Sequence, residues 1–449
     1  MGRERERIFV PAAHALQPQR RLYHKEFSQV QLDPKGVDWT GKINEECYKP
    51  LAMVQRDLDP EVGLSLDVYG ILRTQIRDDA VKDKIRENLK ANGMGDSFIH
   101  PILPFLEDDD KHILIEAGLH ALAKEGIRPE VFWAPESALD NKTVNVVKEC
   151  GYRGILLAPD QVRRADGGKS DNYPMTLPNG LIAIPFDQEV HYEVSFGDIS
   201  NADRFARNTA VRRANESPLG VVVAHTDLET YGHHRPWANY FLDYLLRNSL
   251  ENSGFEVVSI NKLLDRLRSE KYTFPKGELI ENRSWSCSHG LERWKRNCSC
   301  CGSVDGVWKG DFLDTFFWFN SSVKKIVNEE YGEGGKKVES VVSANFEKLL
   351  TNSGGTSSDK DSSLLSARVD GLCSLQSCST FHSGPSTAGW GSVGIGLEAI
   401  EHLQDAGLAR KASELRDGFY KRLQSIRVPY YEKKLNEVAD NMLGDKARG

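Results

Sequence analysis

One stretch decides how the chain folds: Val221-Val222-Val223-Ala224-His225-Thr226-Asp227-Leu228-Glu229-Thr230-Tyr231-Gly232-His233-His234. A β-branched apolar run follows Gly220 and ends at two carboxylates and three imidazoles. A buried strand delivers side chains to a site in this way. We therefore expect chemistry where this strand ends.

A second apolar run has the same construction. Val131-Phe132-Trp133-Ala134 leads into Pro135-Glu136, so a strand again ends on one acid. In an α/β barrel the carboxyl ends of the parallel strands converge on one face. Glu136 and Asp227 can therefore share a site although they lie far apart in the chain.

Strands and helices alternate from Met1 to Phe274, which predicts an α/β fold. The expected strands are Ile8–Ala12, Val62–Val68, Ser97–Phe105, Val131–Ala134, Gly154–Ala158, Leu181–Phe186, Val221–His225 and Phe255–Ile260. The expected helices are Gly70–Leu89, Asp109–Lys124, Asn141–Glu149, Ala202–Arg213 and Trp237–Asn252. Seven or eight such units favour a closed parallel barrel. An open doubly wound sheet is the alternative, but its glycine-rich phosphate motifs are missing from the expected places.

The alternation of strand and helix patterns ends after Pro275, and the composition changes. We expect residues 1–275 to form the catalytic barrel and 276–332 to form a capping segment rich in aromatic and cysteine residues, with a helix over Asp311–Asn328. Residues 333–365 are rich in Gly and Ser and predict a flexible linker, most mobile at Thr351–Ser358. Residues 366–449 predict a C-terminal helical module, with helical periodicity over Gly394–Asp405 and Leu408–Ile426.

The composition is that of an ordinary soluble globular protein, with 39% hydrophobic and 27% charged residues among 449. A net charge of −7 does not provide the excess of positive charge that is typical of proteins that bind nucleic acid or an anionic membrane. The sequence has neither a signal-peptide core nor an apolar segment of the ~20 residues that a transmembrane helix needs. Eight cysteines are too sparse for a disulfide scaffold. We expect a cytoplasmic protein with free thiols and with no nucleic-acid or membrane partner.

Three motifs, in this order and spacing, resemble the signature regions of glycoside hydrolase family 57. They are His14-Ala15-Leu16-Gln17-Pro18, Trp133-Ala134-Pro135-Glu136 and the stretch from His225 to His234. Members of that family are α-glucan amylases, 4-α-glucanotransferases and glucan branching enzymes. The resemblance implies a (β/α)7-type barrel followed by a smaller α-helical module, and an α-glucan or maltooligosaccharide as substrate.

Further motifs resemble the subgroup that carries the DUF3536 domain. These are Trp39–Tyr48, His100–Pro104 and Ser284–Gly290, and the likeness extends from about residue 7 to 330. Two departures stand out. Ala12 occupies a place where the family usually has a histidine, and the chain is shorter than members of that subgroup.

Carried over residue by residue, the resemblance makes Glu136 the nucleophile and Asp227 the general acid/base. A retaining glycosidase needs two carboxyl groups about 5–5.5 Å apart, one ionised and one protonated. Neighbouring carboxylates raise the pKa of an acid that must hold its proton, and Glu229 lies two residues from Asp227. On residues alone, Glu136 can also be a helix-capping acid and Asp227 a turn or capping residue.

Other residues are predicted to contact substrate. By resemblance, His14 and Gln17 contact the sugar in the reacting subsite, and Trp133 is placed to stack on a glucose ring, although it also fits the barrel core. The remaining candidates are His225, Glu229, Tyr231, His233 and, from the second module, His289, with Trp285 and Trp294 more typical of buried structural aromatics.

The leading hypothesis is a retaining hydrolase or transglycosylase acting on α-1,4-glucan through a covalent glycosyl-enzyme, with no cofactor. Two alternatives stay open. His225, Asp227, His233 and His234 supply the ligand types of a metal-dependent polysaccharide deacetylase, but that site usually has its two histidines one helical turn apart. A glucan-binding protein without activity is the other.

Cys298, Cys300 and Cys301, with Cys287 and His289, offer ligands for zinc. Because the pairs lack the two-to-four-residue spacing of common structural zinc sites, the sequence favours ordinary thiols there.

Overall fold

The computed structural model describes residues 6–19, 38–168, 173–296, 298–301, 307–331, 335–351, 359–382 and 387–426. The chain divides into two compact units. The first comprises Met1–Gln17, Asp38–Phe98 and Ala121–Ser286, and the second comprises Pro18–Val37, Ile99–His120 and Cys287–Gly449. Each unit is therefore assembled from three separate stretches of sequence.

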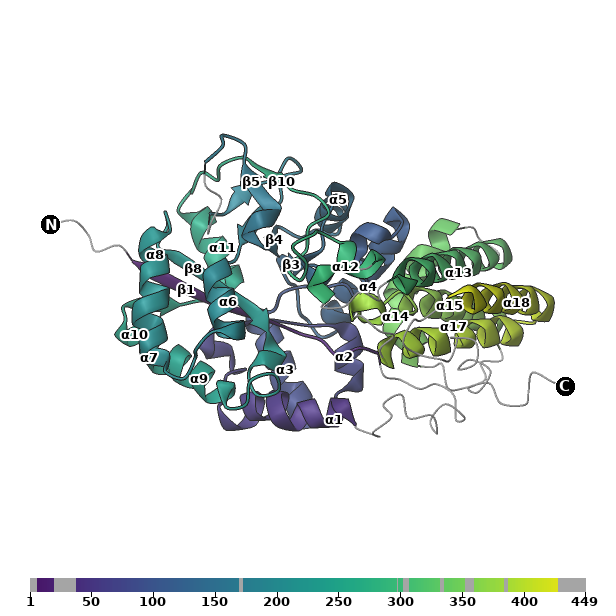
Figure 1. Cartoon of the computed structure of the whole chain (residues 1–449), viewed down its shortest axis with the longest axis horizontal. Helices are drawn as coiled ribbons and strands as arrows, with labels where there is room; N and C mark the ends of the chain where they lie inside the picture. Colours follow the sequence, from purple (N-terminus) through teal and green to yellow (C-terminus); the bar gives the residue numbers. More distant parts are fainter. Residues whose placement is uncertain are drawn as a thin grey trace. The chain divides into compact units, whose positions relative to one another are not determined.

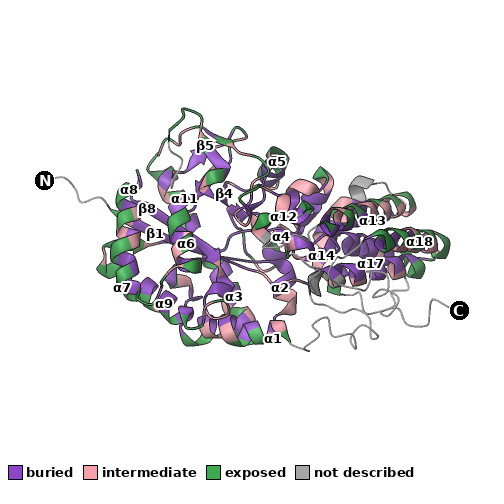
Figure 2. Cartoon of the chain, viewed as in Figure 1, coloured by how far each residue is buried: buried purple, intermediate pink, exposed green. Residues whose placement is uncertain are grey.

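Short strands form the centre of the first unit. They are β1 (Arg7–Ala15), β2 (Ser65–Val68), β3 (Val131–Trp133), β4 (Gly154–Leu157), β5 (Val162–Arg164), β6 (Met175–Thr176), β7 (Ile182–Pro185), β8 (Val221–Asp227), β9 (Phe255–Val257) and β10 (Gly277–Leu279). Figure 1 shows β1 and β8 running side by side. Both strands are buried almost throughout, as their colouring in Figure 2 shows, so they carry apolar residues on both faces.

The strands form two larger sheets, mainly parallel, and a small antiparallel sheet of β5 and β10. β1 pairs in parallel with β2, β8 and β9, and β4 pairs in parallel with β3 and β7, while β6 is antiparallel to β7. Isolated bridges, Leu66 to Gly93 and Gly95 to Phe132, link the sheets on one side. On the other side Asp187 N donates to Val223 O at 2.8 Å.

The barrel is therefore not closed by continuous strand pairing in the described part of the chain, which corrects the prediction of a closed barrel. Gly93 and Gly95 flank the place where one more strand would complete the ring. Glycine weakens strand interiors because it loses more conformational freedom and packs no side chain. The predicted α/β class is confirmed. Between β2 and β3, isolated bridges at Gly93 and Gly95 take the place of a continuous strand.

Helices follow most strands of the first unit. They are α1 (Trp39–Ile43), α2 (Gly70–Gln75), α3 (Asp79–Asn92), α5 (Asn141–Glu149), α6 (Gln188–Phe196), α7 (Ala202–Phe205), α8 (Val211–Glu216), α9 (Ala238–Tyr244), α10 (Leu250–Asn252) and α11 (Ile260–Ser269). π-helical turns at Ala206–Ala210 and Leu245–Ser249 join α7 to α8 and α9 to α10.

Two predicted elements were wrong. Ser97–Phe105 is not a strand: Pro101 and Pro104 interrupt it, and Leu103–Phe105 forms a 3-10 turn. The single helix predicted over Gly70–Leu89 is two helices, because Asp78 caps α3 by accepting from Ala80 N at 3.0 Å.

The second unit is helical. It contains α12 (Glu292–Lys295), α13 (Trp308–Glu330), α14 (Gly335–Thr351), α15 (Lys360–Cys373), α16 (Cys378–Phe381), α17 (Thr387–Asp405) and α18 (Ala409–Ser425), and α4 (Asp108–Lys124) begins in it. α15 is buried from Ser363 to Cys373 and packs on α13, α14 and α17. Buried Arg368 pairs with Asp110 and donates to Asn320 Oδ1 at 2.7 Å, so this charge has partners.

The stretch predicted as a linker, 333–365, contains α14 and the start of α15. Val338, Val342 and Phe346 recur at helical spacing and are buried, which the Gly- and Ser-rich flanks obscured. The most mobile predicted piece, beyond Thr351, lies outside the described residues. Among the helices of the described ranges, none combines the length and apolar character that crossing a membrane requires.

Candidate active site

A cluster of rings lies where β1, β3 and β8 end. Trp133 lies 4.0 Å from His225 and 4.8 Å from Trp285 between ring centroids, and His14 stacks on His225 at 5.8 Å. Trp133 and His225 have no exposed surface. Sequence reasoning expected Trp133 to stack on glucose or to fill the core, and in this structure its neighbours are protein rings. Contact with substrate stays a prediction for Trp133 and His225.

β1 holds His14 beside one of the predicted acids. His14 pairs in register with Asp227 on β8, and its Nε2 lies 3.1 Å from Asp227 Oδ1. Burial, and then the charge of His191, hold the pKa of His14 down at about 3. The imidazole is therefore neutral near pH 7, so its contact with Asp227 is not an ion pair.

Asp227 lies in surroundings that favour its protonated form. Loss of water around the carboxyl raises its pKa well above the usual range, and the charges of Glu229 and Glu136 raise it further. Because 43% of the side chain stays exposed, the loss of water is partial, and the two carboxylates are the firmer cause. The interaction with Glu136 also places both predicted catalytic acids in one electrostatic neighbourhood.

Glu136 stands on an unusual backbone. Its φ is 56° and that of Ser137 is 51°, both in the left-handed region that costs energy for residues other than glycine. Its carboxylate Oε2 accepts from Ser286 Oγ at 2.5 Å and from Trp285 Nε1 at 3.4 Å, and its backbone oxygen accepts from Ser284 Oγ at 2.8 Å. Such donors stabilise an ionised carboxylate.

Neither acid has the capping role left open by the sequence. Asp140 caps α5, accepting from Thr143 N at 2.7 Å. Asp227 begins the 3-10 turn Leu228–Thr230 without a capping hydrogen bond from its side chain. Asp140, and not Glu136, therefore caps α5, and Asp227 occupies a turn position without capping the turn through its side chain.

Glu229 is buried and linked to the first motif. Its Oε1 accepts from Tyr48 OH at 2.5 Å and from Leu16 N at 3.1 Å, while Gln17 Nε2 donates to Tyr48 OH at 3.4 Å. Burial raises the pKa of Glu229 to about 7, against the lowering effect of these hydrogen bonds. Glu229 and Gln17 therefore belong to one hydrogen-bonded group beside Asp227.

The other predicted residues have different partners. Tyr231 is buried, and its hydroxyl accepts from Thr226 Oγ1 at 3.2 Å. His233 Nδ1 lies 2.6 Å from Glu46 Oε2. His289 belongs to the second unit, where it contacts Cys298 and Cys300. Their roles toward substrate stay predictions.

Sequence reasoning missed two buried acids of the same unit. Asp67 pairs in register with His14 on the opposite side from Asp227, and Asp96 follows the glycines that interrupt the ring. Burial raises the pKa of Asp67 well above its usual value and that of Asp96 to about 8. Asp67 could have been identified from the sequence, because it is an acidic residue inside the apolar run Val62–Val68.

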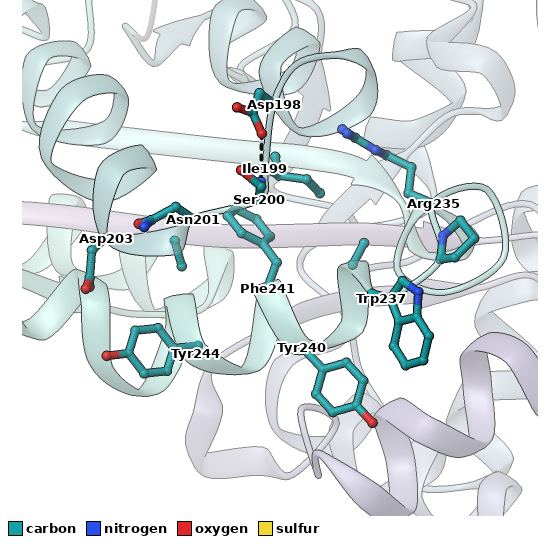
Figure 3. Close-up of a pocket in the computed structure, with 13 residues that line it drawn as sticks. Asp198, Ile199, Ser200, Asn201, Asp203, Arg235, Trp237, Tyr240, Phe241 and Tyr244 are labelled. Carbon is teal, nitrogen blue, oxygen red and sulfur yellow. Dashed lines mark hydrogen bonds between the residues drawn. The ribbon is translucent and has the colours of Figure 1, made fainter.

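A surface hollow of about 630 Å³ lies elsewhere in the first unit, and Figure 3 shows its lining. The rings of Trp237 and Tyr240 stack with centroids 6.0 Å apart, and both side chains are exposed. Trp237 has a φ of 70° at the start of α9. None of the predicted site residues lines this hollow.

Residues 12–275, more than half of the chain, match the family described as glycosyl hydrolase family 57. The chain belongs to glycosyl hydrolase family 57. The prediction of an enzyme of this family is confirmed, and the resemblance to the DUF3536-type subgroup stays a prediction. No curated protein sequence matches the chain.

Solved structures share this family 57 fold. An exo-type maltose-forming amylase from Pyrococcus sp. ST04 has a TM-score of 0.74 at 17% identity, covering 93% of this chain and 83% of the amylase. A branching enzyme from Thermococcus kodakaraensis, in complex with glucose, has a TM-score of 0.60 at 15% identity, covering 95% and 97%. A 4-alpha-glucanotransferase from Thermococcus litoralis has 0.58 at 14%, covering 89% of this chain and 60% of its own. At such identities the likeness establishes the fold alone.

Proposed function

We propose that this family 57 enzyme cleaves α-1,4-linked glucan with net retention, through a covalent glycosyl-enzyme on Glu136. The observation that carries the proposal is the opposite environment of the two acids. Ser286 and Trp285 donate to the carboxylate of Glu136, which favours its ionised form. Loss of water, together with the charges of Glu229 and Glu136, favours the protonated form of Asp227. A retaining mechanism needs this division.

In the first step, an oxygen of Glu136 bonds to the anomeric carbon as the glycosidic bond breaks. Asp227 gives its proton to the departing sugar oxygen. Formation of the ester removes the negative charge of Glu136, which is one of the charges that raise the pKa of Asp227. Asp227 then becomes a better base. It takes a proton from water or from a sugar hydroxyl, whose oxygen attacks the anomeric carbon and releases Glu136.

The solved relatives support an α-glucan substrate, since they are named as an amylase, a glucanotransferase and a branching enzyme. Attack by water gives hydrolysis, and attack by a sugar hydroxyl gives transfer. The motifs Trp39–Tyr48 and Ser284–Gly290 support membership of the DUF3536-type subgroup.

The deacetylase alternative is weaker. Within the described ranges, His225, Asp227, His233 and His234 do not form one of the groups whose ligand atoms come close enough to share a metal. His233 pairs with Glu46, and the ring of His225 is fully buried.

The test is incubation of wild type, Glu136→Gln and Asp227→Asn with maltoheptaose and amylose, with products separated by chain length. Glu149→Gln, an exposed acid on α5, is the matched control and should behave as wild type. Shortening or redistribution of chains by wild type and Glu149→Gln, lost in the other two variants, supports the proposal. Wild type that binds glucan without changing it would instead identify a binding protein, with Ala12, which pairs in register with His225, as the first residue to examine.

A further inference from the structure

Four possible metal ligands meet in the second unit, and none of them has a role in the mechanism above. Cys287, His289, Cys298 and Cys300 each offer one ligand atom, and all four atoms lie within 4.8 Å of one another. Cys287 Sγ lies 3.6 Å from Cys298 Sγ. His289 Nδ1 lies 3.4 Å from Cys298 Sγ and 3.3 Å from Cys300 Sγ.

We propose that Cys287, His289, Cys298 and Cys300 bind one zinc ion. Zinc bonds of about 2.3 Å to sulfur and about 2.0–2.1 Å to nitrogen place tetrahedral ligand atoms roughly 3.5–3.8 Å apart. The three separations given above approach this spacing to within a few tenths of an ångström, and every other pair of ligand atoms lies within 4.8 Å. Three cysteines and one histidine are a common structural zinc set.

The local fold explains why the pairs converge despite their short spacing. Cys287-x-His289 lies on a turn closed by Gly290, whose N donates to Cys287 O at 3.0 Å and whose φ is 80°. Such a positive φ is easy for glycine alone. Cys298-x-Cys300 reaches into the 3-10 turn Ser299–Cys301. The spacing of the cysteines in the sequence argued against zinc. Spacing alone does not show that the two pairs lie on separate turns that face each other.

The helix between the pairs fixes their separation. Trp294 on α12 has no exposed surface and anchors the helix. Arg293 Nη2 donates to Cys300 O at 2.6 Å, and Lys309 Nζ donates to Arg293 O at 2.7 Å. Three thiolates and a neutral imidazole around Zn²⁺ leave one net negative charge, and the guanidinium of Arg293 lies beside it.

The protein itself supplies all four ligands, so this site is structural and has no open position for catalysis. Binding joins the turn at Cys287 to the turn at Cys298, and the binding free energy adds to stability because the unfolded chain lacks the assembled site. The proposal does not depend on the proposed glucan chemistry.

The test is the zinc content of the full chain, purified without added metal and dialysed against a weak chelator. Wild type should retain about one zinc per chain. Cys300→Ser and Cys298→Ser should lose most of it. Cys378→Ser, a thiol of the same unit with exposure similar to that of Cys300, is the matched control and should retain it. His289→Cys should also retain zinc, because four cysteines are an equally good ligand set.

Cobalt offers a second measurement that does not depend on the variants. Wild type refilled with Co²⁺ should gain the absorption of thiolate-to-cobalt charge transfer, and Cys300→Ser should lose part of it. Wild type without bound zinc, or a Cys287–Cys298 disulfide found by mass spectrometry of the unreduced chain, would overturn the proposal. Full zinc retention by Cys298→Ser would do the same.

Discussion

Glu136 and Asp227 both follow buried strands of the first unit, and they differ in backbone and in surroundings. Glu136 has a left-handed backbone and receives hydrogen bonds from Trp285 and Ser286. Asp227 ends a regular strand with a φ of −65° and has carboxylates and a neutral histidine around it. The comparison teaches that the same strand-end position can place two carboxyl groups in opposite surroundings, one among hydrogen-bond donors and the other near further carboxyl groups.

The largest expected effect is on activity, and substrates with different leaving groups should distinguish the roles of the two acids. Glu136→Gln should lose activity by on the order of 10⁴-fold or more on every substrate, since no nucleophile remains. Asp227→Asn should lose about 10²–10⁴-fold on maltooligosaccharides, the contribution of an acid catalyst. On a nitrophenyl maltoside its loss should be much smaller, because that leaving group departs without a proton. We would measure kcat/KM for both substrates; equal losses for Asp227→Asn would contradict its acid role.

The next effect tests the donors to Glu136. Ser286→Ala removes the shorter of the two side-chain hydrogen bonds to the carboxylate of Glu136. Because this donor stabilises and orients the nucleophile, kcat/KM should fall roughly tenfold. Ser269→Ala is the control, because that hydroxyl donates within α11. An unchanged kcat/KM in Ser286→Ala would refute this contribution.

A smaller effect should follow from the negative neighbour of Asp227. Glu229→Gln removes a charge that raises the pKa of Asp227, so that pKa should fall. Because Asp227 acts when protonated, the basic side of the profile should move to lower pH, and activity near pH 7 should fall by roughly a few-fold. Tyr48→Phe removes a hydrogen bond that lowers the pKa of Glu229, so Glu229 should become more protonated and the basic side should move in the same direction by a smaller amount. An unchanged basic side in Glu229→Gln would contradict this effect of charge.

The smallest effect concerns backbone conformation alone. Trp237 shares the positive φ of Glu136 but lies at the surface hollow. Trp237→Gly should relieve the strained conformation and raise the free energy of unfolding by up to about 1 kcal/mol. Denaturant unfolding measures the change, with Tyr240→Gly, inside the same helix, as the contrasting variant that should destabilise. A loss of stability in Trp237→Gly would mean that its contacts outweigh the strain.

The sequence predicted the strand ends well, because apolar runs ending on acids are local patterns. Val221–Val223 and Val131–Trp133 form the strands expected, and His14 lies beside Asp227. The two acids that the motifs indicated also interact electrostatically. Their catalytic roles stay predictions until the variants are measured.

The contacts around each acid could not be predicted, because they are long-range. Nothing in Ser284–Ser286 indicates that these residues reach Glu136, nearly 150 positions earlier. The positive φ of Glu136 likewise depends on what surrounds it. The open ring was missed because two glycines in a short segment carry little periodic signal, and α14 was missed because its flanks are rich in Gly and Ser.

The interleaving of the two units in the chain limits how this protein can be divided. The first unit is complete only after Ser286, and the second already uses Ile99–His120. A chain cut after Pro275 would lack Trp285 and Ser286, and with them the donors to Glu136. It would also keep one piece of the second unit without the rest. A gene fusion or fragment exchange that moves the catalytic part as a single insert should therefore give an inactive protein. The two units are expected to be transferred together.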